Sequence, residues 1–510
     1  MEQTLSDGPS SQGTTKDIIR KGSIITIITL ISRPLGYIRE AIQAYLFGAT
    51  FLVDAFIVAF NFPELIQTLF FSGATSAFLI PVCVRYMKDK DDYSAIYSTF
   101  INLAIVLTVS LSLLFLAFSN GIVSLIAPGF SPEAKTITKL LFIIMIPVVA
   151  LHTILSVIKA FLNAKEHFAA PEMSGILWNF AFILSAVLLR KKLGIYSLAI
   201  GVTAGSFLQI LMQVPYLRKF DIRYHPILSL KHPAISEAKR LFTGALIATS
   251  IVPINSFVGR IIASYLPQGE VASLAYAFRI FILPFSLFAV PIYTVVFSKL
   301  SKLYHEKDWK GMHSHVDSSV VLLAVTLIPC TILLCSVGDA VIKILYERGA
   351  FTAKETLMTN RALFGYSIGL LFYALSISFV RVFNSIHDMR TPAIVGITSI
   401  IINAVLASLL MVPFKNLGIS LATSIVSLYN FAMLYVLLKK RTRYALKRAT
   451  VREITRSLLA GIILLFGIFL VRREVTESPW PLITIATALT ALIYGIFFRN
   501  YYLGLLRRSR

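Results

Sequence analysis

Arginine residues occur within long apolar stretches of this sequence, where a charged group is unexpected. Arg33 and Arg39 lie in the first of these stretches, and Arg260 and Arg279 lie in two later ones. An arginine at membrane depth costs about 2.5 to 3.5 kcal/mol on insertion scales, so several of them need a reason. The guanidinium group is always charged, is weakly hydrated and binds phosphate oxygens in a bidentate manner. Arginines that face an internal cavity would therefore suit a polyanion, such as a lipid linked through pyrophosphate.

Each of these arginines, taken alone, also has a simpler explanation. It can pair with an acid, as Arg39 could with Glu40, or extend its side chain to the interface. Three or four arginines against so few buried acids favour the cavity. Pro34 and Gly36 also predict a local break in the first helix, and a break within a membrane is tolerated only where the backbone faces protein or a wet cavity. We therefore expect Arg33 and Arg39 to face the interior of the protein rather than the lipid.

Asp54, in the second apolar stretch, is an acid at membrane depth. It could be a structural partner that holds the first and second spans together. It could instead be a proton-sensitive or substrate-facing group. The sequence favours neither interpretation.

Asn384 and Asp388 stand four residues apart near the end of another apolar stretch. One helical face that presents an amide and a carboxylate could coordinate a hard cation such as sodium through its oxygens. Asp388 is also followed four residues later by Pro392, which is the pattern of ordinary cap and turn chemistry. The cap is the favoured interpretation, and the ion site is the alternative.

The elements that position these residues are membrane-spanning helices. Of the 510 residues, 56% are hydrophobic and 14% are charged, and the mean hydropathy is +0.77. The apolar stretches repeatedly reach the length of about 20 residues that crosses about 30 Å of hydrocarbon. We therefore predict an all-α, polytopic integral membrane protein of about fourteen transmembrane helices. The spans lie near residues 22–47, 51–86, 95–118, 135–163, 172–190, 194–217, 237–265, 270–300, 315–346, 358–386, 390–412, 416–439, 452–471 and 479–503.

The net charge of +23 is explained by topology rather than by nucleic acid. The basic residues gather in loops between spans, mainly near residues 218–240, 299–310 and 439–448. If the N-terminus is cytoplasmic, these clusters all face the cytoplasm, in agreement with the positive-inside rule. We expect cytoplasmic N- and C-termini, secondary contacts with anionic membrane lipids and no nucleic-acid partner.

A weak internal repeat indicates two lobes. Residues 53–60 and 271–278 share an Ala-Phe pair followed by a proline, and they lie six spans apart, so the two copies have the same orientation. Parallel repeats of this kind suggest two pseudo-repeated six-helix lobes that flank a cavity, as in alternating-access transporters. The predicted parts are a disordered cytoplasmic tail (1–21), an N-terminal lobe (22–217), a basic cytoplasmic linker (218–236), a C-terminal lobe (237–439), a basic cytoplasmic loop (440–451), and a C-terminal helical hairpin with a basic tail (452–510).

Several of these residues belong to a longer ordered pattern near the N-terminus. Its elements are Ser32 to Glu40 (SRPLGYIRE), Phe47 to Ala49 (FGA), Val53 to Phe60 (VDAFIVAF), Pro63 and Phe78 to Pro81 (FLIP). The pattern closely resembles SRxLGxxRD, FGA, TDAFxVAF, P and FVPI of the MurJ (MviN) flippases, a family of the MOP exporter superfamily. Further along, residues 277–279 resemble the family's ADR, and residues 388–392 resemble its DTxTP.

The resemblance implies a flippase that translocates lipid II, the lipid-linked peptidoglycan precursor, from the inner to the outer leaflet of the bacterial inner membrane. It implies alternating access through a cationic cavity. By position, the family's essential cavity arginines map onto Arg33, Arg39 and Arg279, and its essential aspartate maps onto Asp54. Arg260 joins the substrate-binding set. The resemblance implies no cofactor and no enzymatic activity, with the membrane potential or a coupling ion, sodium or a proton, as the source of energy.

Departures from the family pattern keep a second substrate class open. Gln67, Thr68 and Ser72 stand where the family has an arginine pair and an acid, and Gly259 replaces an acid that is associated with a sodium site in some members. The alternative is a MOP-type exporter of another polyprenyl-pyrophosphate-linked glycan. A glycosyltransferase is less favoured, because the outer loops are short and contain no paired carboxylates.

Overall fold

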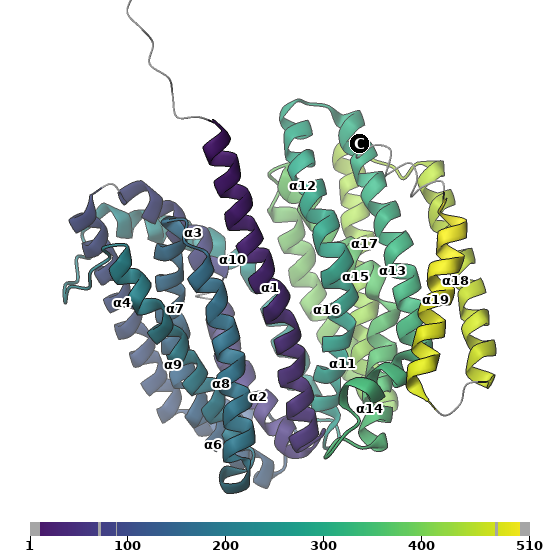
Figure 1. Ribbon diagram of the computed structural model, residues 1–510, viewed down its shortest axis with the longest axis horizontal. Coiled ribbons are helices and arrows are strands. Elements are labelled where there is room, and N and C mark those ends of the chain that lie inside the picture. Colours follow the sequence, from purple (N-terminus) through teal and green to yellow (C-terminus); the bar gives the residue numbers. More distant parts are fainter. Residues whose placement is uncertain (1–10, 70–72, 88, 475–477, 500–510) are drawn as a thin grey trace, which may run out of the picture. The chain divides into compact units, whose positions relative to one another are not determined.

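The structure is a computed structural model that describes residues 11–69, 73–87, 89–474 and 478–499. Every element in these ranges is a helix (Figure 1). Ten helical segments of the described residues are long and apolar enough to cross a membrane. The bent pair α14 (Ala353–Ile368) and α15 (Leu370–Ser385) makes an eleventh if it is one span. Three further spans were predicted. Span 22–47 falls on α1 (Ser11–Phe47), span 51–86 on α2 (Phe51–Gln67) and α3 (Gly73–Tyr86), and span 237–265 on α10 (Pro233–Ala263). The count of fourteen crossings stays a prediction.

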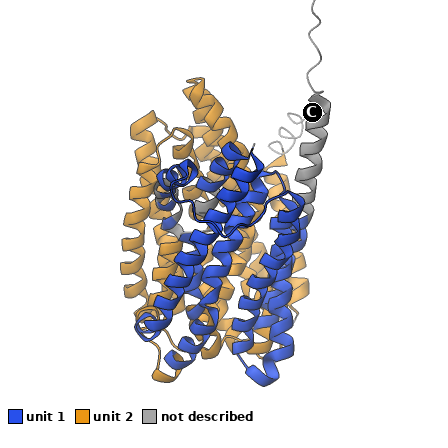
Figure 2. Ribbon diagram, turned by 90° about the vertical axis from the view of Figure 1, so that its left-hand side faces the viewer, with its two compact units in different colours: residues 1–43, 59–124, 135–250 blue, residues 44–58, 125–134, 251–510 orange. Residues whose placement is uncertain are grey.

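The chain divides into two compact units (Figure 2). Unit 1 comprises residues 1–43, 59–124 and 135–250, and unit 2 comprises residues 44–58, 125–134 and 251–510. Both α1 and α2 contribute to both units. The helices of the first half are α1 (Ser11–Phe47), α2 (Phe51–Gln67), α3 (Gly73–Tyr86), α4 (Lys90–Ala117), α5 (Ser119–Ile126), α6 (Pro132–Met145), α7 (Pro147–Ala164), α8 (Ala169–Leu193), α9 (Tyr196–Lys219) and α10 (Pro233–Ala263).

Unit 2 holds the remaining helices. A π-helical turn, η2 (Phe285–Ala289), interrupts one of its long spans, and such turns are frequent at functional sites. In its C-terminal part, α18 and α19 pack against α13, where the Tyr494 hydroxyl donates to the Ser457 carbonyl at 2.8 Å. The helices are α11 (Glu270–Pro284), α12 (Val290–His305), α13 (Trp309–Tyr346), α14 (Ala353–Ile368), α15 (Leu370–Ser385), α16 (Arg390–Phe414), α17 (Asn416–Thr442), α18 (Arg448–Glu474) and α19 (Pro479–Phe497).

Backbone conformation supports a pseudo-repeat, but at an offset of 221–222 residues rather than the 218 residues that separate the two sequence motifs. Three of the first-half turns that hold a residue at positive φ have a counterpart in the second half, at spacings of 221, 221 and 222 residues. The pairs are Glu166 and His387, Gly194 and Lys415, and Asp221 and Arg443. In the middle pair even ψ agrees, with φ 55° and ψ −133° at Gly194 against φ 53° and ψ −130° at Lys415. The Gly194 turn joins α8 to α9, and the Lys415 turn joins α16 to α17. The two helices of each pair pack closely against each other.

Helix α1 corrects two predictions. It begins at Ser11, so residues 11–21, predicted to be disordered, are helical; the rest of that tail lies outside the described residues. The same helix continues through Pro34 and Gly36, so the predicted break is wrong. A proline removes one main-chain hydrogen bond but does not by itself end a helix whose other hydrogen bonds continue on both sides.

Candidate functional site

Arg39 lies in unit 1, between α1 and α8. Its Nη2 donates to Oε1 of Glu40 at 3.0 Å, and the two side chains are 14% and 11% exposed. The guanidinium carbon lies 4.8 Å from the ring centroid of Trp178 and 5.3 Å from that of Phe182, both on α8. Cation–π contacts of this kind are worth about 0.5–2 kcal/mol, depending on desolvation. Arg39 therefore joins α1 to α8, and the pairing with Glu40, which the sequence offered as the simpler explanation, is present; a role of Arg39 in substrate binding stays a prediction.

Arg33 is exposed on α1, six residues before Arg39. Arg260 is half-buried on α10, and Arg279 is exposed on α11. Arg33 and Arg39 thus belong to unit 1, whereas Arg260 and Arg279 belong to unit 2. That all four line one cavity stays a prediction.

Asp54 caps a helix from outside that helix. It is 3% exposed on α2, and its carboxylate accepts the backbone N–H of Gly269 at 2.5 Å and that of Ala272 at 2.7 Å. Gly269 is the N-cap residue of α11 and has no side chain that could cap it. A carboxylate at this position satisfies two orphan N–H groups and lies at the positive end of the helix dipole. Asp54 is therefore a structural partner, but of α11, the helix that carries Arg279, rather than of the first span.

Two glycines allow the backbone to approach closely around this cap. Gly269 has φ +86°, and a Cβ there would lie 2.2 Å from the carbonyl oxygen of Ala49. Gly48 has φ +64°, and its Cβ would lie 2.4 Å from the carbonyl oxygen of Ala350. The Tyr276 hydroxyl donates to the Gly48 carbonyl at 3.2 Å. The Phe-Gly-Ala motif is thus the tight turn that brings α2 to the start of α11.

A second carboxylate, at Glu270, extends the arrangement and was missed by the sequence reasoning. Glu270 is the first residue of α11, is 6% exposed, and accepts the backbone N–H of Asn416 at the start of α17 at 2.9 Å. The Asn416 side chain in turn donates to the Met358 carbonyl of α14 at 2.9 Å. Asp54 caps α11, and α11 caps α17, so two buried acids link three helices. The detectable signal was Gly269 followed by an acid, a helix start that lacks its own Ser, Thr, Asp or Asn cap.

Asp388 makes the cap that was the favoured interpretation. It lies just before α16, and its carboxylate accepts the Thr391 N–H at 3.1 Å and the Thr391 hydroxyl at 2.7 Å, and pairs with Arg441. Burial raises the pKa of Asp388, but the Thr391 hydrogen bonds and the Arg441 charge outweigh it, so the pKa lies below its ordinary value. Asn384 is the next-to-last residue of α15, one turn earlier, and its carbonyl accepts the His387 N–H. Among the described residues, no group of three or more His, Cys, Asp or Glu side chains could hold a metal ion.

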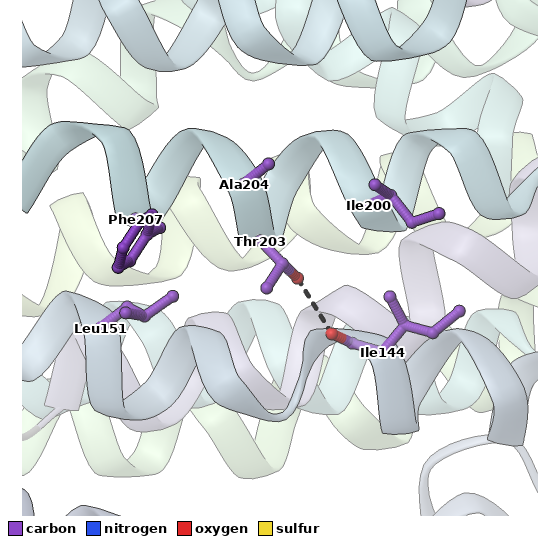
Figure 3. Close-up of a pocket in the computed structure, with 6 residues that line it drawn as sticks. All are labelled: Ile144, Leu151, Ile200, Thr203, Ala204 and Phe207. Carbon is purple, nitrogen blue, oxygen red and sulfur yellow. Dashed lines mark hydrogen bonds between the residues drawn. The ribbon is translucent and has the colours of Figure 1, made fainter. Parts of the chain in front are cut away.

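An apolar groove lies in unit 1 (Figure 3). Its volume is about 400 Å³, and it lies between the end of α6, α7 and α9. The hydroxyl of Thr203 donates to the Ile144 carbonyl at 2.9 Å, as Figure 3 shows, so it is already used within the protein. The lining holds no charged side chain, and this groove is therefore not the predicted anion site. It is lined by Ile144, Leu151, Ile200, Thr203, Ala204 and Phe207.

The helical, pseudo-repeated architecture has the fold of the MOP transporters. An inward-facing multidrug resistance MATE transporter of the MOP superfamily is similar at a TM-score of 0.70 and 13% identity, over 80% of this chain and 94% of that one. Likeness at this identity shows the fold alone. The chain is thus a multi-pass helical membrane protein of this fold class, and the predicted all-α polytopic fold is confirmed.

Closer relatives define the family. The sequence model described as "Lipid II flippase MurJ" matches residues 43–490, and the chain belongs to this family. A probable lipid II flippase MurJ of Buchnera aphidicola is 27% identical over 477 residues, which are 92% of this chain and 93% of the relative. A solved structure of the lipid II flippase MurJ, in an inward closed conformation, has a TM-score of 0.83 and 27% identity over 94% of this chain and 99% of that one. The predicted family is confirmed.

Proposed function

We propose that this protein is a transporter that moves lipid II from the inner to the outer leaflet of the bacterial inner membrane by alternating access. The observation that carries the proposal is the family match over residues 43–490, which includes most of both units. The protein acts by binding and releasing its substrate rather than by catalysing a reaction. Its termini are cytoplasmic, because that orientation places the basic loops inside.

The arginines bind the pyrophosphate of the substrate. Arg33 and Arg279 are exposed side chains on membrane helices, and a guanidinium matches phosphate oxygens in a bidentate manner. Arg260 contributes positive charge from α10. Arg39 acts differently: because it is paired with Glu40 and lies over two aromatic rings, it holds α1 and α8 in place. Asp54 holds the N-terminus of α11 in place and so also sets the position of Arg279, which lies on the same helix.

The membrane potential supplies the driving force. Moving one elementary charge across the membrane is worth about 2.3 kcal/mol per 100 mV. With the inside negative, this favours outward movement of an anionic headgroup and return of a cationic empty site. A cation site at Asp388 is not part of this mechanism, because its carboxylate already accepts Thr391 and pairs with Arg441.

Complementation tests the proposal. The native lipid II flippase is depleted in a host that expresses this chain, and survival is scored for the wild type and for Arg33→Ala and Arg279→Ala. Arg473→Ala, at the exposed end of α18, is the matched control. We expect rescue by the wild type and by the control, and loss of rescue in the two test variants although they insert normally.

Two other outcomes would change the conclusion. If the correctly inserted wild type fails to rescue, the substrate is another polyprenyl-pyrophosphate glycan, in line with Gln67, Thr68 and Ser72 at the family's charged positions. If Arg33→Lys and Arg279→Lys keep full activity, bidentate recognition of the pyrophosphate is wrong.

A further inference from the structure

The segment that joins α9 to α10, residues 220–232, lies along α4 in unit 1; we call it the strap. Its first part is anchored in the core of unit 1, since Ile222 is only 3% exposed. An ion pair and a hydrogen bond join it to the start of α4. Lys90 binds Asp221 at 2.8 Å, and Asp92 contacts His232 at 2.9 Å. Both ends of the strap are therefore held at the same end of α4.

Between these ends, a polar stripe on α4 binds the backbone of the strap. The Ser98 hydroxyl accepts the N–H of His225 at 2.9 Å, and the Thr99 hydroxyl accepts that of Ser229 at 3.2 Å. The Asn102 amide donates to the Ile227 carbonyl at 2.7 Å. The stripe comprises Ser94, Ser98, Thr99 and Asn102, which share one face because they lie four, five and eight residues after the first. Ser94 completes it by accepting the N–H of Arg223 at 3.2 Å.

The stripe begins near the first residue of α4 and continues toward the part of the helix that crosses the hydrocarbon. Asn102 lies twelve residues after Lys90, which is about 18 Å along the helix axis. The 28 residues of α4 measure about 42 Å, whereas the hydrocarbon core is about 30 Å thick. Val106 and Leu107, one turn beyond Asn102, are 56% and 57% exposed apolar side chains in this candidate span. The excess of about 12 Å over the hydrocarbon thickness is shared between the two ends of α4, so by length alone the part of α4 that binds the middle of the strap, about 12–18 Å from its start, falls at and just inside the hydrocarbon boundary.

The side chains of the strap match that position. Tyr224 and Leu230 are each 54% exposed, Leu228 is 49% exposed and Ile227 is 40% exposed. The tyrosine hydroxyl donates to the Asn102 side chain at 2.8 Å, which leaves its ring as an apolar surface. Arg218, Lys219, Arg223 and Lys231 add positive charge at and beside the ends of the strap.

We propose that the strap is a membrane-inserted interfacial loop that binds the anionic phospholipids of one leaflet. The apolar side chains of residues 224–230 enter the boundary with the acyl chains, and the basic residues contact the headgroups. This explains the polar stripe, because backbone N–H and C=O groups at that depth lack water and must be satisfied by protein. In the orientation proposed above, the leaflet is the cytoplasmic one. The inference does not depend on which lipid-linked substrate is transported.

Spin labelling of the full-length protein in vesicles tests the proposal. The three native cysteines are replaced by alanine, and a nitroxide is attached at Leu228→Cys. Lys307→Cys, in the exposed turn after α12, is the aqueous reference, and Val106→Cys is the lipid reference. The vesicles contain phosphatidylglycerol and phosphatidylethanolamine, and collision rates with oxygen and with a water-soluble nickel chelate are compared.

We expect the label at 228 to collide several-fold less with the chelate than the label at 307, and to resemble the label at 106 in its oxygen accessibility. Replacing Arg223 and Lys231 by glutamine should reduce this difference, and so should lowering the phosphatidylglycerol content. Chelate accessibility at 228 equal to that at 307 would show that the strap faces water. Protection from both reagents would show that a protein surface covers it. Either result overturns the proposal.

A second pair of variants tests the role of the stripe. Ser98→Ala removes a hydroxyl that accepts a strap N–H, whereas Ser110→Ala makes the same change at an exposed position on the same helix. We expect the mobility of the nitroxide at 228 to increase in Ser98→Ala and to stay unchanged in Ser110→Ala. Equal mobility in the two variants would contradict the proposed function of the stripe.

Discussion

Removing the Asp54 carboxylate should loosen the start of α11 before it affects any other part of unit 2. The carboxylate accepts two backbone N–H groups, at 2.5 and 2.7 Å. A hydrogen bond to a charged group contributes about 1.5–3 kcal/mol. Asp54→Asn keeps one accepting oxygen, so it should lower the local opening free energy of this turn by about that amount. Asp54→Ala leaves both buried donors unsatisfied and should cost about twice as much.

Hydrogen exchange measured by mass spectrometry on peptides that cover residues 266–274 reports this change directly. A loss of 1.5–3 kcal/mol in opening free energy raises the exchange rate of the protected amides by about tenfold or more. Asp308→Asn is the matched control. Asp308 is the N-cap of α13 and accepts the Gly311 N–H at 2.8 Å. It should raise exchange at residues 309–311 and leave 266–274 unaffected.

The reasoning is wrong if Asp54→Ala folds, inserts and shows the same exchange at 266–274 as the wild type. In that case the two amides would be protected by the packing around Gly269 alone. A general rise in exchange across unit 2 would also contradict it, because a capping role predicts a local effect centred on Gly269 and Ala272.

Three further outcomes are expected from thermal and pH unfolding of the protein in detergent. Lys415→Gly should stabilise the folded protein by about 1 kcal/mol, because φ 53° with ψ −130° suits only glycine. Gly194→Ala, at the equivalent turn of the other repeat, should destabilise it by a similar amount. Stability changes of the same sign in the two variants would refute the idea that both turns carry the same backbone strain. Arg39→Lys should destabilise the folded protein by about 1 kcal/mol, because an ammonium stacks less well than a guanidinium on the Trp178 and Phe182 rings. Arg33→Lys should leave the unfolding temperature unchanged. Equal effects of the two variants would contradict the structural role of Arg39. The pKa of Asp388 is lower in the folded state, so its contribution to stability is present above pH 4 and lost as the pH falls through the folded pKa. Stability measured from about pH 5 to pH 3 should therefore fall less steeply in Asp388→Asn than in the wild type.

The helices could be predicted from sequence because the membrane imposes a length that apolar stretches display openly. Within the described residues, all fourteen predicted spans fall on helices, although the ends differ by several residues. The break predicted at Pro34 failed because a proline signals a lost hydrogen bond but not whether the flanking helix tolerates it. The repeat was visible only as a weak motif at residues 53 and 271, and the matching turns at Gly194 and Lys415 have different residue types.

The partners of the buried charges were less predictable. The membrane cost identified Asp54 as a residue that needs a partner, but its partners are backbone amides 215 and 218 residues away, and backbone amides carry no sequence signature. Glu40 beside Arg39 could be read directly from the sequence. The Trp178 ring could not, because it reaches Arg39 only through the packing of α8 on α1.

Two buried acids of unit 2, Asp54 and Glu270, serve as helix caps. An arginine and an aspartate in one membrane protein suggest an internal ion pair, in which the aspartate cancels the charge that a substrate would need. Asp54 and Glu270 instead accept backbone N–H groups at the starts of α11 and α17, where the helix dipole and the orphan donors stabilise a carboxylate. The cap at Asp54 therefore accounts for that acid without using an arginine. The anion-binding hypothesis then depends on Arg33 and Arg279, and loss of transport in Arg39→Ala would support it only if the packing of α8 on α1 stayed intact.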